Sequence, residues 1–237
     1  MPSAPKWLFD VVERLSPKLP SMVVTATRLL SSSVKKITFS GDFSGLDFRE
    51  GYCIDFRVTD TEVRRYTPSF VDDVNGILEL VVHLHGNAPG ARFMDALQPG
   101  DTVNISAPRG HKYYDIGTDN YVIFGDETSL ALACSFQQSF KKNRQDFRFY
   151  LELDPENGEV PALLGLENYT VFPKNGAFKN PEIIKLLPQL QDMSWRLATF
   201  ILTGNVVSAQ ALRKALKGVA QGKVHLQGYW ISGKKGL

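Results

Sequence analysis

The spacing of apolar residues changes once along this chain of 237 residues, and that change limits the folds open to it. Up to about residue 109, short runs rich in β-branched and aromatic residues follow one another between turn residues. Beyond residue 117, strand-like runs alternate with segments of helical spacing. Consecutive short strands indicate an antiparallel sheet, whereas strands alternating with helices indicate a mainly parallel one. We therefore expect two domains of different class.

The first domain, residues 20–115, is predicted to be a small barrel of six antiparallel strands. One helical turn is expected near residues 90–97. In front of the domain, residues 1–19 form an extension whose apolar spacing predicts an amphipathic helix over 4–15. The six runs predicted as strands are 22–30, 34–42, 52–59, 64–71, 77–85 and 102–109.

The second domain, residues 116–237, follows a seam at Tyr114–Thr118 and is predicted to contain a five-stranded, mainly parallel sheet covered by helices on both faces. Ligands of such sheets bind at the carboxyl ends of the strands. The strands are expected at 121–125, 146–153, 168–172, 197–203 and 223–230, and the helices at 126–142, 181–190 and 208–219.

Composition narrows the possible functions. Because no run approaches about 18 apolar residues and no basic segment precedes an apolar one at the start, neither a membrane span nor a secretory signal is expected, and we expect a cytoplasmic monomer. Cys53 and Cys134 are isolated, which argues against iron–sulfur clusters, zinc sites and disulfides. The net charge of +2 does not favour nucleic acid as a partner.

Charge is unevenly distributed near the C-terminus. No acidic residue follows Asp192, so this segment forms either a surface that attracts an anionic ligand or an ordinary solvated helix face and tail. The basic residues there are Arg196, Arg213, Lys214, Lys217, Lys223, Lys234 and Lys235.

Three short segments contain candidate binding residues. In Arg64-Arg65-Tyr66-Thr67, the two-residue period of a strand places Arg64 and Tyr66 on one face, where a guanidinium can hold a phosphate beside an aromatic ring. An exposed Arg next to a half-buried Tyr is the alternative. In the loop 85–93, Gly90 and Ala91 leave backbone amides accessible at a helix start, which suits a pyrophosphate, although a simple chain turn explains the loop equally well.

The third segment is Gly125-Asp126-Glu127-Thr128-Ser129-Leu130, after the first strand of the second domain. Asp126 or Thr128 either caps the following helix or contacts a dinucleotide at the junction of strand and helix. The glycine fingerprint of a standard dinucleotide site is absent.

Taken in order over residues 20–237, these motifs resemble the siderophore-interacting protein family, FAD-dependent ferric-siderophore reductases related to ferredoxin–NADP reductases. The resemblance implies FAD as cofactor, NADPH, NADH or a ferredoxin-like protein as electron donor, and a ferric siderophore as substrate. The motifs are RRYT (64–67), HGNAPGARF (85–93), PGDTVNISAPRG (99–110), GDETSLALA (125–133), TGNVVSAQALRKAL (203–216) and QGYWISGKK (227–235).

The resemblance also assigns residues. It implies that Arg64 grips the FAD phosphate, that Tyr66 packs on the isoalloxazine, and that Thr67 hydrogen-bonds near its N5. The remaining residues expected to bind cofactor are His85, Pro89, Gly90, Ala91, Arg92, Asp126, Thr128 and Trp230. Substrate is expected to bind to cations of this chain that compensate for two the family has and this chain lacks, and these are Arg109, Lys112, Lys234 and Lys235.

This chain departs from the family pattern at several positions. Asp55 and Ile231 stand where the family has a Lys and an Arg linked to holding the iron chelate. The other departures are Ser69, Ala91, Ala131, Asn205 and the segment Val171-Phe172-Pro173-Lys174. They leave two alternatives open: a related flavin reductase with a different acceptor, and a non-catalytic flavin- or nucleotide-binding module.

No protein metal site is expected. The four histidines lack chelating spacing such as HExxH, and although His83 and His85 share a strand face, ordinary strand histidines explain them better.

Overall fold

The chain divides between Lys112 and Tyr113 into two compact units. The computed structural model describes residues 4–7, 10–11 and 20–233. Half of the helix expected over 4–15, and the tail lysines Lys234 and Lys235, therefore fall outside the described residues. Within the described part of the chain, no helix combines the length and the apolar character needed to cross a membrane.

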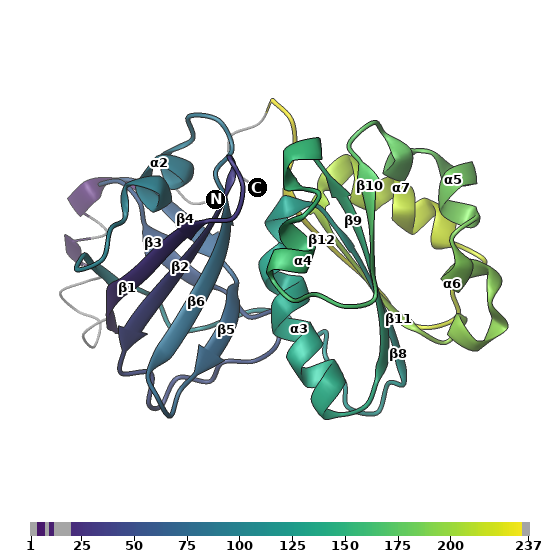
Figure 1. Cartoon of the computed structure of the whole chain (residues 1–237), viewed down its shortest axis with the longest axis horizontal. Coiled ribbons are helices and arrows are strands. Elements are labelled where there is room, and N and C mark those ends of the chain that lie inside the picture. Colours follow the sequence, from purple (N-terminus) through teal and green to yellow (C-terminus); the bar gives the residue numbers. More distant parts are fainter. Residues whose placement is uncertain (1–3, 8–9, 12–19, 234–237) are drawn as a thin grey trace. The chain divides into compact units, whose positions relative to one another are not determined.

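The first unit contains an antiparallel sheet with the strand order β5-β6-β2-β1-β7 and a separate antiparallel hairpin of β3 and β4 (Figure 1). One helix, α2 (Pro89–Ala96), lies at the position of the expected helical turn. The strands are β1 (Ser21–Leu29), β2 (Val34–Gly41), β3 (Ile54–Arg57), β4 (Val63–Tyr66), β5 (Pro68–Asp72), β6 (Ile77–His83) and β7 (Thr102–Asn104).

The run predicted as one strand over 64–71 is two strands, so this part of the prediction is wrong. β4 pairs with β3, whereas β5 pairs with β6, and the change of partner falls at Thr67. The next residue, Pro68, has no amide hydrogen to donate to a ladder, so a single strand could not pair regularly through this point.

Alternating residues of the strands build the core of the first unit. Ile37 and Phe39 of β2, together with Ile54 and Phe56 of β3, are fully buried in one apolar cluster. Met94 of α2 belongs to the same cluster. The helix is therefore packed against the inner face of the strands. Alternate residues of a strand point to the same face of a sheet, so the apolar ones form one face that has to be covered.

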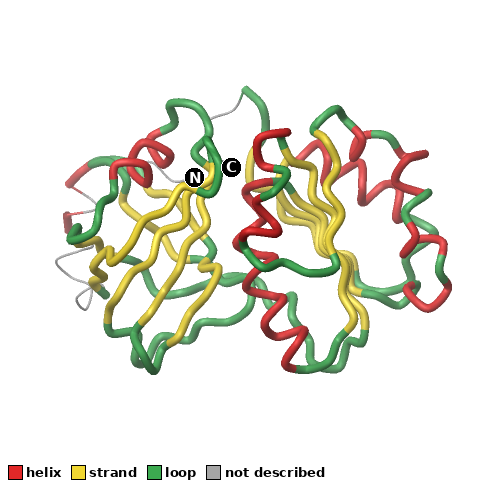
Figure 2. Tube along the Cα trace, in the orientation of Figure 1, coloured by secondary structure: helices red, strands yellow, loops and turns green. Residues whose placement is uncertain are grey.

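The second unit is a five-stranded parallel sheet in the order β10-β9-β8-β11-β12, as the sequence predicts (Figure 2). The strands are β8 (Asn120–Gly125), β9 (Asp146–Leu153), β10 (Tyr169–Pro173), β11 (Thr199–Asn205) and β12 (Val224–Trp230). The helices are α3 (Leu130–Lys142), α4 (Val160–Leu163), α5 (Pro181–Lys185), α6 (Pro188–Gln191) and α7 (Val206–Leu216).

Helices cover both faces of this sheet. Phe140 of α3 stacks on Tyr121 of β8, with ring centroids 4.6 Å apart, while Leu212 of α7 is buried in a cluster with Phe200 of β11. The single helix expected over 181–190 is instead the pair α5 and α6. Pro188 explains the break, because it lacks an amide hydrogen and disfavours helical geometry in the residue before it.

The strand order places a topological switch point between β8 and β11. From β8 the chain proceeds to β9 and β10 on one side, and it then returns to β11 and β12 on the other. In open parallel sheets, ligands bind outside the carboxyl ends of the two strands at such a point. Here those ends are Gly125 and Asn205.

Candidate functional site

The β3–β4 hairpin separates the two arginines of the first motif onto opposite faces. Arg64 pairs with Phe56 and Tyr66 pairs with Ile54, so these four side chains share the face that meets the core. Arg65 projects from the other face. The rings of Tyr66 and Phe56 meet edge to face, with centroids 5.7 Å apart. The two-residue period therefore fixes which arginine stands beside the tyrosine.

Gly90 of α2 packs directly on that pair. A Cβ atom on Gly90 would lie 2.7 Å from the Tyr66 hydroxyl oxygen and 2.9 Å from Cγ of Arg64. The helix begins after Ala88, whose side chain offers no cap, and Pro89 occupies its first turn. The amides of this first turn are thus left for an external acceptor, next to an arginine and a phenol.

The charges around Arg64 are partly balanced within the hairpin. Its guanidinium donates to Oε1 of Glu62 at 2.8 Å and to the carbonyl oxygen of Val63 at 2.9 Å, and 19% of its side chain is exposed. Burial raises the pKa of Tyr66 and outweighs the opposing effect of the positive charge of Arg64. Tyr66 therefore stays a neutral phenol throughout the physiological range.

The other residues expected at the cofactor lie around this pair with differing exposure. Thr67 is half-buried where the chain passes from β4 to β5, and Ala91 is buried on the inner side of α2. Arg92 is exposed on the same helix. His85 is exposed beyond the end of β6, its ring centroid 5.4 Å from that of His83.

The residues present fit a flavin dinucleotide. The uncapped start of α2, which Gly90 brings against the hairpin, and the cation of Arg64 are what a pyrophosphate needs, and the ring of Tyr66 offers an aromatic surface. We find these groups within one unit, formed by segments that are more than twenty residues apart in the sequence.

On the opposite face of the hairpin, Asp55 is neutralised by two arginines. Nε of Arg65 donates to its Oδ1 at 3.1 Å, and Arg109 forms an ion pair with its Oδ2. The Asp55 side chain is 14% exposed and that of Arg109 58%. The group carries one net positive charge, so the carboxylate at position 55 does not make this surface acidic. Lys112 follows Arg109 closely in the sequence, and its side chain is exposed.

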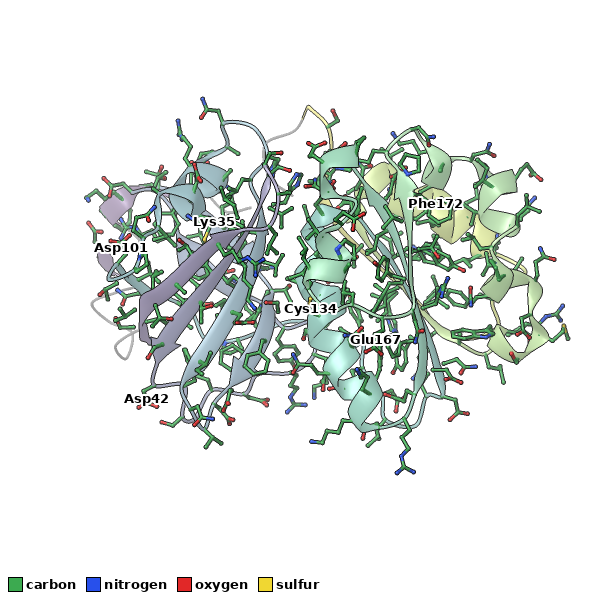
Figure 3. The ribbon with its side chains drawn as sticks, viewed as in Figure 1. Lys35, Asp42, Asp101, Cys134, Glu167 and Phe172 are labelled. Atoms are coloured by element: carbon green, nitrogen blue, oxygen red, sulfur yellow. The ribbon has the colours of Figure 1, made fainter. Side chains whose placement is uncertain are left out.

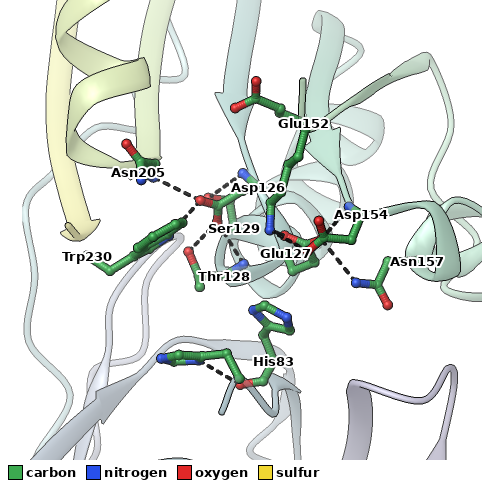
Figure 4. Close-up of polar contacts among 12 residues, drawn as sticks. His83, Asp126, Glu127, Thr128, Ser129, Glu152, Asp154, Asn157, Asn205 and Trp230 are labelled. Atoms are coloured by element: carbon green, nitrogen blue, oxygen red, sulfur yellow. Dashed lines mark hydrogen bonds and ion pairs between the residues drawn. The ribbon is translucent and has the colours of Figure 1, made fainter. Parts of the chain in front are cut away.

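In the second unit, Asp126 lies at the switch point and caps the turn that begins α3 (Figure 4). Its Oδ1 accepts from the amide of Thr128 at 2.9 Å and from the Thr128 hydroxyl at 2.5 Å. Its Oδ2 accepts from the amide of Asn205 at 2.8 Å and from Nε1 of Trp230 at 2.7 Å. The sequence left two roles open for Asp126, capping the following helix or contacting a dinucleotide, and the structure shows Asp126 as a helix cap.

These bonds tie the carboxyl ends of three strands together. Asp126 follows β8, Asn205 ends β11, and Trp230 ends β12. Gly204 has a φ of +82°, and a Cβ there would lie 2.6 Å from the Asp126 carboxylate, so only glycine allows this close approach. The indole of Trp230 also lies 5.9 Å from Nζ of Lys174.

A buried ionic cluster beside this point was not anticipated from the sequence. The fully buried carboxylate of Glu127 pairs with Nζ of Lys174 at 2.5 Å, and Lys174 also pairs with Asp154 at 2.9 Å. The amide of Asp154 and the side chain of Asn157 donate to Glu127 at 2.7 and 3.0 Å. The sequence did contain a signal for this cluster, because Glu127, Asp154 and Lys174 each come just after a predicted parallel strand. Side chains in that position gather at the same edge of the sheet.

The cluster stabilises its own charges. Burial by itself would raise the pKa of Glu127, but the amide of Asp154, Lys174 and Asn157 together outweigh it, and the pKa is lowered. Burial would likewise lower the pKa of Lys174, whereas Glu127 and Asp154 raise it. Both groups are therefore held in their charged forms at neutral pH.

Comparison with known proteins agrees with this geometry. Residues 21–114 match the family model described as "Oxidoreductase FAD-binding domain". The chain is 26% identical over 87 residues to NADH-cytochrome b5 reductase 1 of Mycosarcoma maydis, an alignment that covers 36% of this chain and only 27% of that protein. The matched domain confirms the predicted FAD cofactor.

Solved structures with the same fold include the siderophore-interacting protein of Acinetobacter baumannii, at a TM-score of 0.73 and 18% identity, covering 92% of this chain and 93% of that one. Phthalate dioxygenase reductase, described as transferring electrons from pyridine nucleotides to [2Fe-2S], aligns at a TM-score of 0.72 and 14% identity, covering 90% of this chain and 69% of that one. At such identities the likeness concerns the fold, and the two-domain ferredoxin-reductase-like architecture is confirmed.

Proposed function

We propose that this chain is an FAD-dependent oxidoreductase that reduces a ferric siderophore with electrons from NADH, NADPH or a ferredoxin-like protein. The observation that carries the proposal is the packing of Gly90 on Tyr66 and Arg64, which brings a cation, an aromatic ring and a helix start together inside the matched FAD-binding domain. The expected cytoplasmic location and monomeric state are part of the same proposal.

Each residue of the arrangement has a role toward the cofactor. Arg64 holds a phosphate oxygen, the ring of Tyr66 packs on the isoalloxazine, and Thr67 hydrogen-bonds to its edge. The amides at Gly90 and Ala91 receive the pyrophosphate, with Pro89, Arg92 and His85 around them. When bound, the flavin converts the electron pair of a hydride into the single electrons that ferric iron accepts.

The surface around Asp55 supports an anionic iron chelate as the substrate. Arg65 and Arg109 outnumber the one carboxylate, and Arg109 keeps most of its side chain in solvent, so an incoming chelate meets a net positive charge. One hydride reduces two ferric ions to Fe(II). Hard anionic oxygens bind the lower charge less tightly, and the iron is then released.

The switch point of the second unit supports a pyridine nucleotide as donor. Ligands of open parallel sheets bind outside the carboxyl ends of the strands where the order reverses, and here those are β8 and β11. The residues at those ends are Asp126, Thr128 and Asn205, and Trp230 is hydrogen-bonded to the same carboxylate.

A second candidate is a flavin reductase with a different acceptor, such as an iron–sulfur protein. The observation that favours it is the carboxylate of Asp55, which stands where the resembled family has a lysine and reduces the positive charge of this surface from two to one. Ile231, where the resembled family has an arginine, removes another cation.

The test is reconstitution followed by turnover. Purified protein is loaded with FAD, reduced anaerobically with NADH or NADPH, and mixed with a ferric siderophore in the presence of a ferrous-specific chelating dye. Bleaching of the flavin band followed by formation of the ferrous dye complex supports the proposal. Bleaching that only other acceptors reverse selects the second candidate, and protein that takes up FAD but is reduced by no donor indicates a binding module.

A further inference from the structure

One buried lysine is not used by the arrangement described above. Lys35 is the second residue of β2, pairs with Leu29 of β1 and Val82 of β6 on either side, and is 4% exposed (Figure 3). It is on the strand face that also carries Ile37 and Phe39 of the core. An ammonium in such a position is unfavourable unless every one of its donors has a partner.

All three N–H donors of the Lys35 ammonium have acceptors at the C-terminal end of α2. Nζ donates to the carbonyl oxygens of Met94 at 3.1 Å, Asp95 at 2.6 Å and Leu97 at 3.0 Å. The last carbonyls of a helix have no partner within the helix, and α2 has no basic residue of its own in its last turn. The lysine therefore supplies from the sheet the C-terminal cap that the helix lacks.

The two ends of α2 are thus held by different strands. Lys35 of β2 fixes the C-terminal end, and Arg64 and Tyr66 of β4 contact Gly90 at the N-terminal end. The helix has eight residues and spans about 12 Å, so a shift or rotation at one end is transmitted to the other. We propose that Lys35 is a positioning residue for the cofactor, which sets the first-turn amides of α2 against its pyrophosphate.

The positive charge of Lys35, like its hydrogen bonds, favours binding of the cofactor's pyrophosphate at the N-terminal end of α2. The C-terminal end of a helix carries partial negative charge, which opposes binding of an anion at the N-terminal end. A cation at the C-terminal carbonyls offsets that negative end. An apolar residue at position 35 would leave buried carbonyls of Met94 and Leu97 without a partner and would restore the opposing charge.

Lys36 provides a matched control on the same strand. It faces the other side of the sheet, is 33% exposed and pairs with Glu79 of β6 at 2.8 Å. Because it faces away from α2, it does not share the hydrogen bonds that Lys35 makes with that helix. Replacing either lysine by methionine removes the same charge from the protein, so net charge cannot explain a difference between the two variants.

The inference rests on the proposed function, and the experiment separates the two. Apoproteins of the wild type, Lys35→Met, Lys35→Arg and Lys36→Met are titrated with FAD by flavin fluorescence quenching, after circular dichroism has shown that each is folded. We expect Lys35→Met to raise the Kd for FAD about tenfold, equivalent to about 1.4 kcal/mol. Lys35→Arg should restore most of the affinity, and Lys36→Met should leave it within about twofold of the wild type.

A merely structural role predicts a different result. It would lower the thermal midpoint of Lys35→Met while leaving the Kd measured well below that midpoint unchanged, and this outcome overturns the inference. So does an equal loss of affinity in Lys36→Met. If Lys35→Met does not fold, Lys35→Gln keeps an amide donor without the charge and is expected to bind FAD less tightly than Lys35→Arg. Wild-type protein that binds FAD but reduces no ferric chelate defeats the proposed substrate and leaves this inference standing, whereas wild-type protein without FAD affinity defeats both.

Discussion

Gly90 lies so close to Tyr66 that a Cβ atom on it would be 2.7 Å from the tyrosine hydroxyl oxygen. The same atom would be 2.9 Å from Cγ of Arg64. The start of α2 and the β3–β4 hairpin therefore meet at a distance that only glycine permits. This contact joins two motifs that are more than twenty residues apart in the sequence.

Gly90→Ala is expected to move the start of α2 away from the hairpin and to raise the Kd for FAD about tenfold, because the added methyl group cannot be accommodated without a shift. Fluorescence titration measures the change. Gly158→Ala is the control, since its Cβ would meet only the carbonyl oxygen of Pro155 at 3.4 Å. Wild-type affinity in Gly90→Ala would show that the start of α2 does not contact the cofactor.

Arg64→Ala should weaken FAD binding by about 1.5–3 kcal/mol, the range for a hydrogen bond to a charged group. Arg65→Ala is its matched control, because Arg65 projects from the other face of the hairpin and pairs with Asp55. We expect Arg65→Ala to retain FAD and to raise the KM for a ferric siderophore instead. If the two variants lose FAD equally, the assignment of faces to functions is wrong.

Glu62→Gln should tighten FAD binding. Glu62 pairs with the Arg64 guanidinium at 2.8 Å and so competes with a phosphate for it. Neutralising this carboxylate removes a partly exposed ion pair worth about 0.2–1 kcal/mol, which predicts an increase in affinity of up to about fivefold. Isothermal titration of apoprotein with FAD measures it. A weaker affinity would mean that Glu62 orients Arg64 for the phosphate rather than competing with it.

Lys174→Met should strongly destabilise the second unit, since it leaves the fully buried carboxylate of Glu127 without a cation. Removal of one partner from a buried ion pair typically costs about 3–5 kcal/mol. The free energy of unfolding, measured in urea, gives the effect. Adding Glu127→Gln to Lys174→Met should recover part of the loss, because it removes the unpaired charge; a double variant no more stable than Lys174→Met would contradict this account.

The lowered pKa of Glu127 predicts acid sensitivity with a definite sign. The folded protein holds this proton less tightly than the unfolded chain, whose glutamates titrate near 4.5. The stabilisation is therefore present above about pH 4.5 and is lost as the pH falls through the lower folded value. Unfolding free energies of wild type and Glu127→Gln, compared from pH 7 to pH 3, should differ most near neutrality and converge in acid. A constant difference would rule out Glu127 as the titrating group.

The secondary structure was largely predictable because it depends on local pattern. The run 146–153 forms β9 with the same bounds, and the two-residue period correctly placed Arg64 and Tyr66 on one face. Two of the errors occurred at prolines inside predicted elements: Pro68 separates β4 from β5, and Pro188 separates α5 from α6. In both cases the proline deprives the backbone of a hydrogen-bond donor. The short helix α4 was not predicted, and β7 ends before the strand expected over 102–109 does.

The amino-acid sequence by itself determined the two fold classes, the order of their elements and the residue types available for binding, since periodicity and turn residues act over a few neighbours. Only the tertiary structure decided which of those residues meet. The contact of Gly90 with Tyr66, the bonds from Lys35 to the end of α2, and the pairing of Glu127 with Lys174 all join segments far apart in the chain. Such contacts depend on strand order and on packing. Both are determined by parts of the chain that are distant in sequence, so a local sequence pattern cannot predict them.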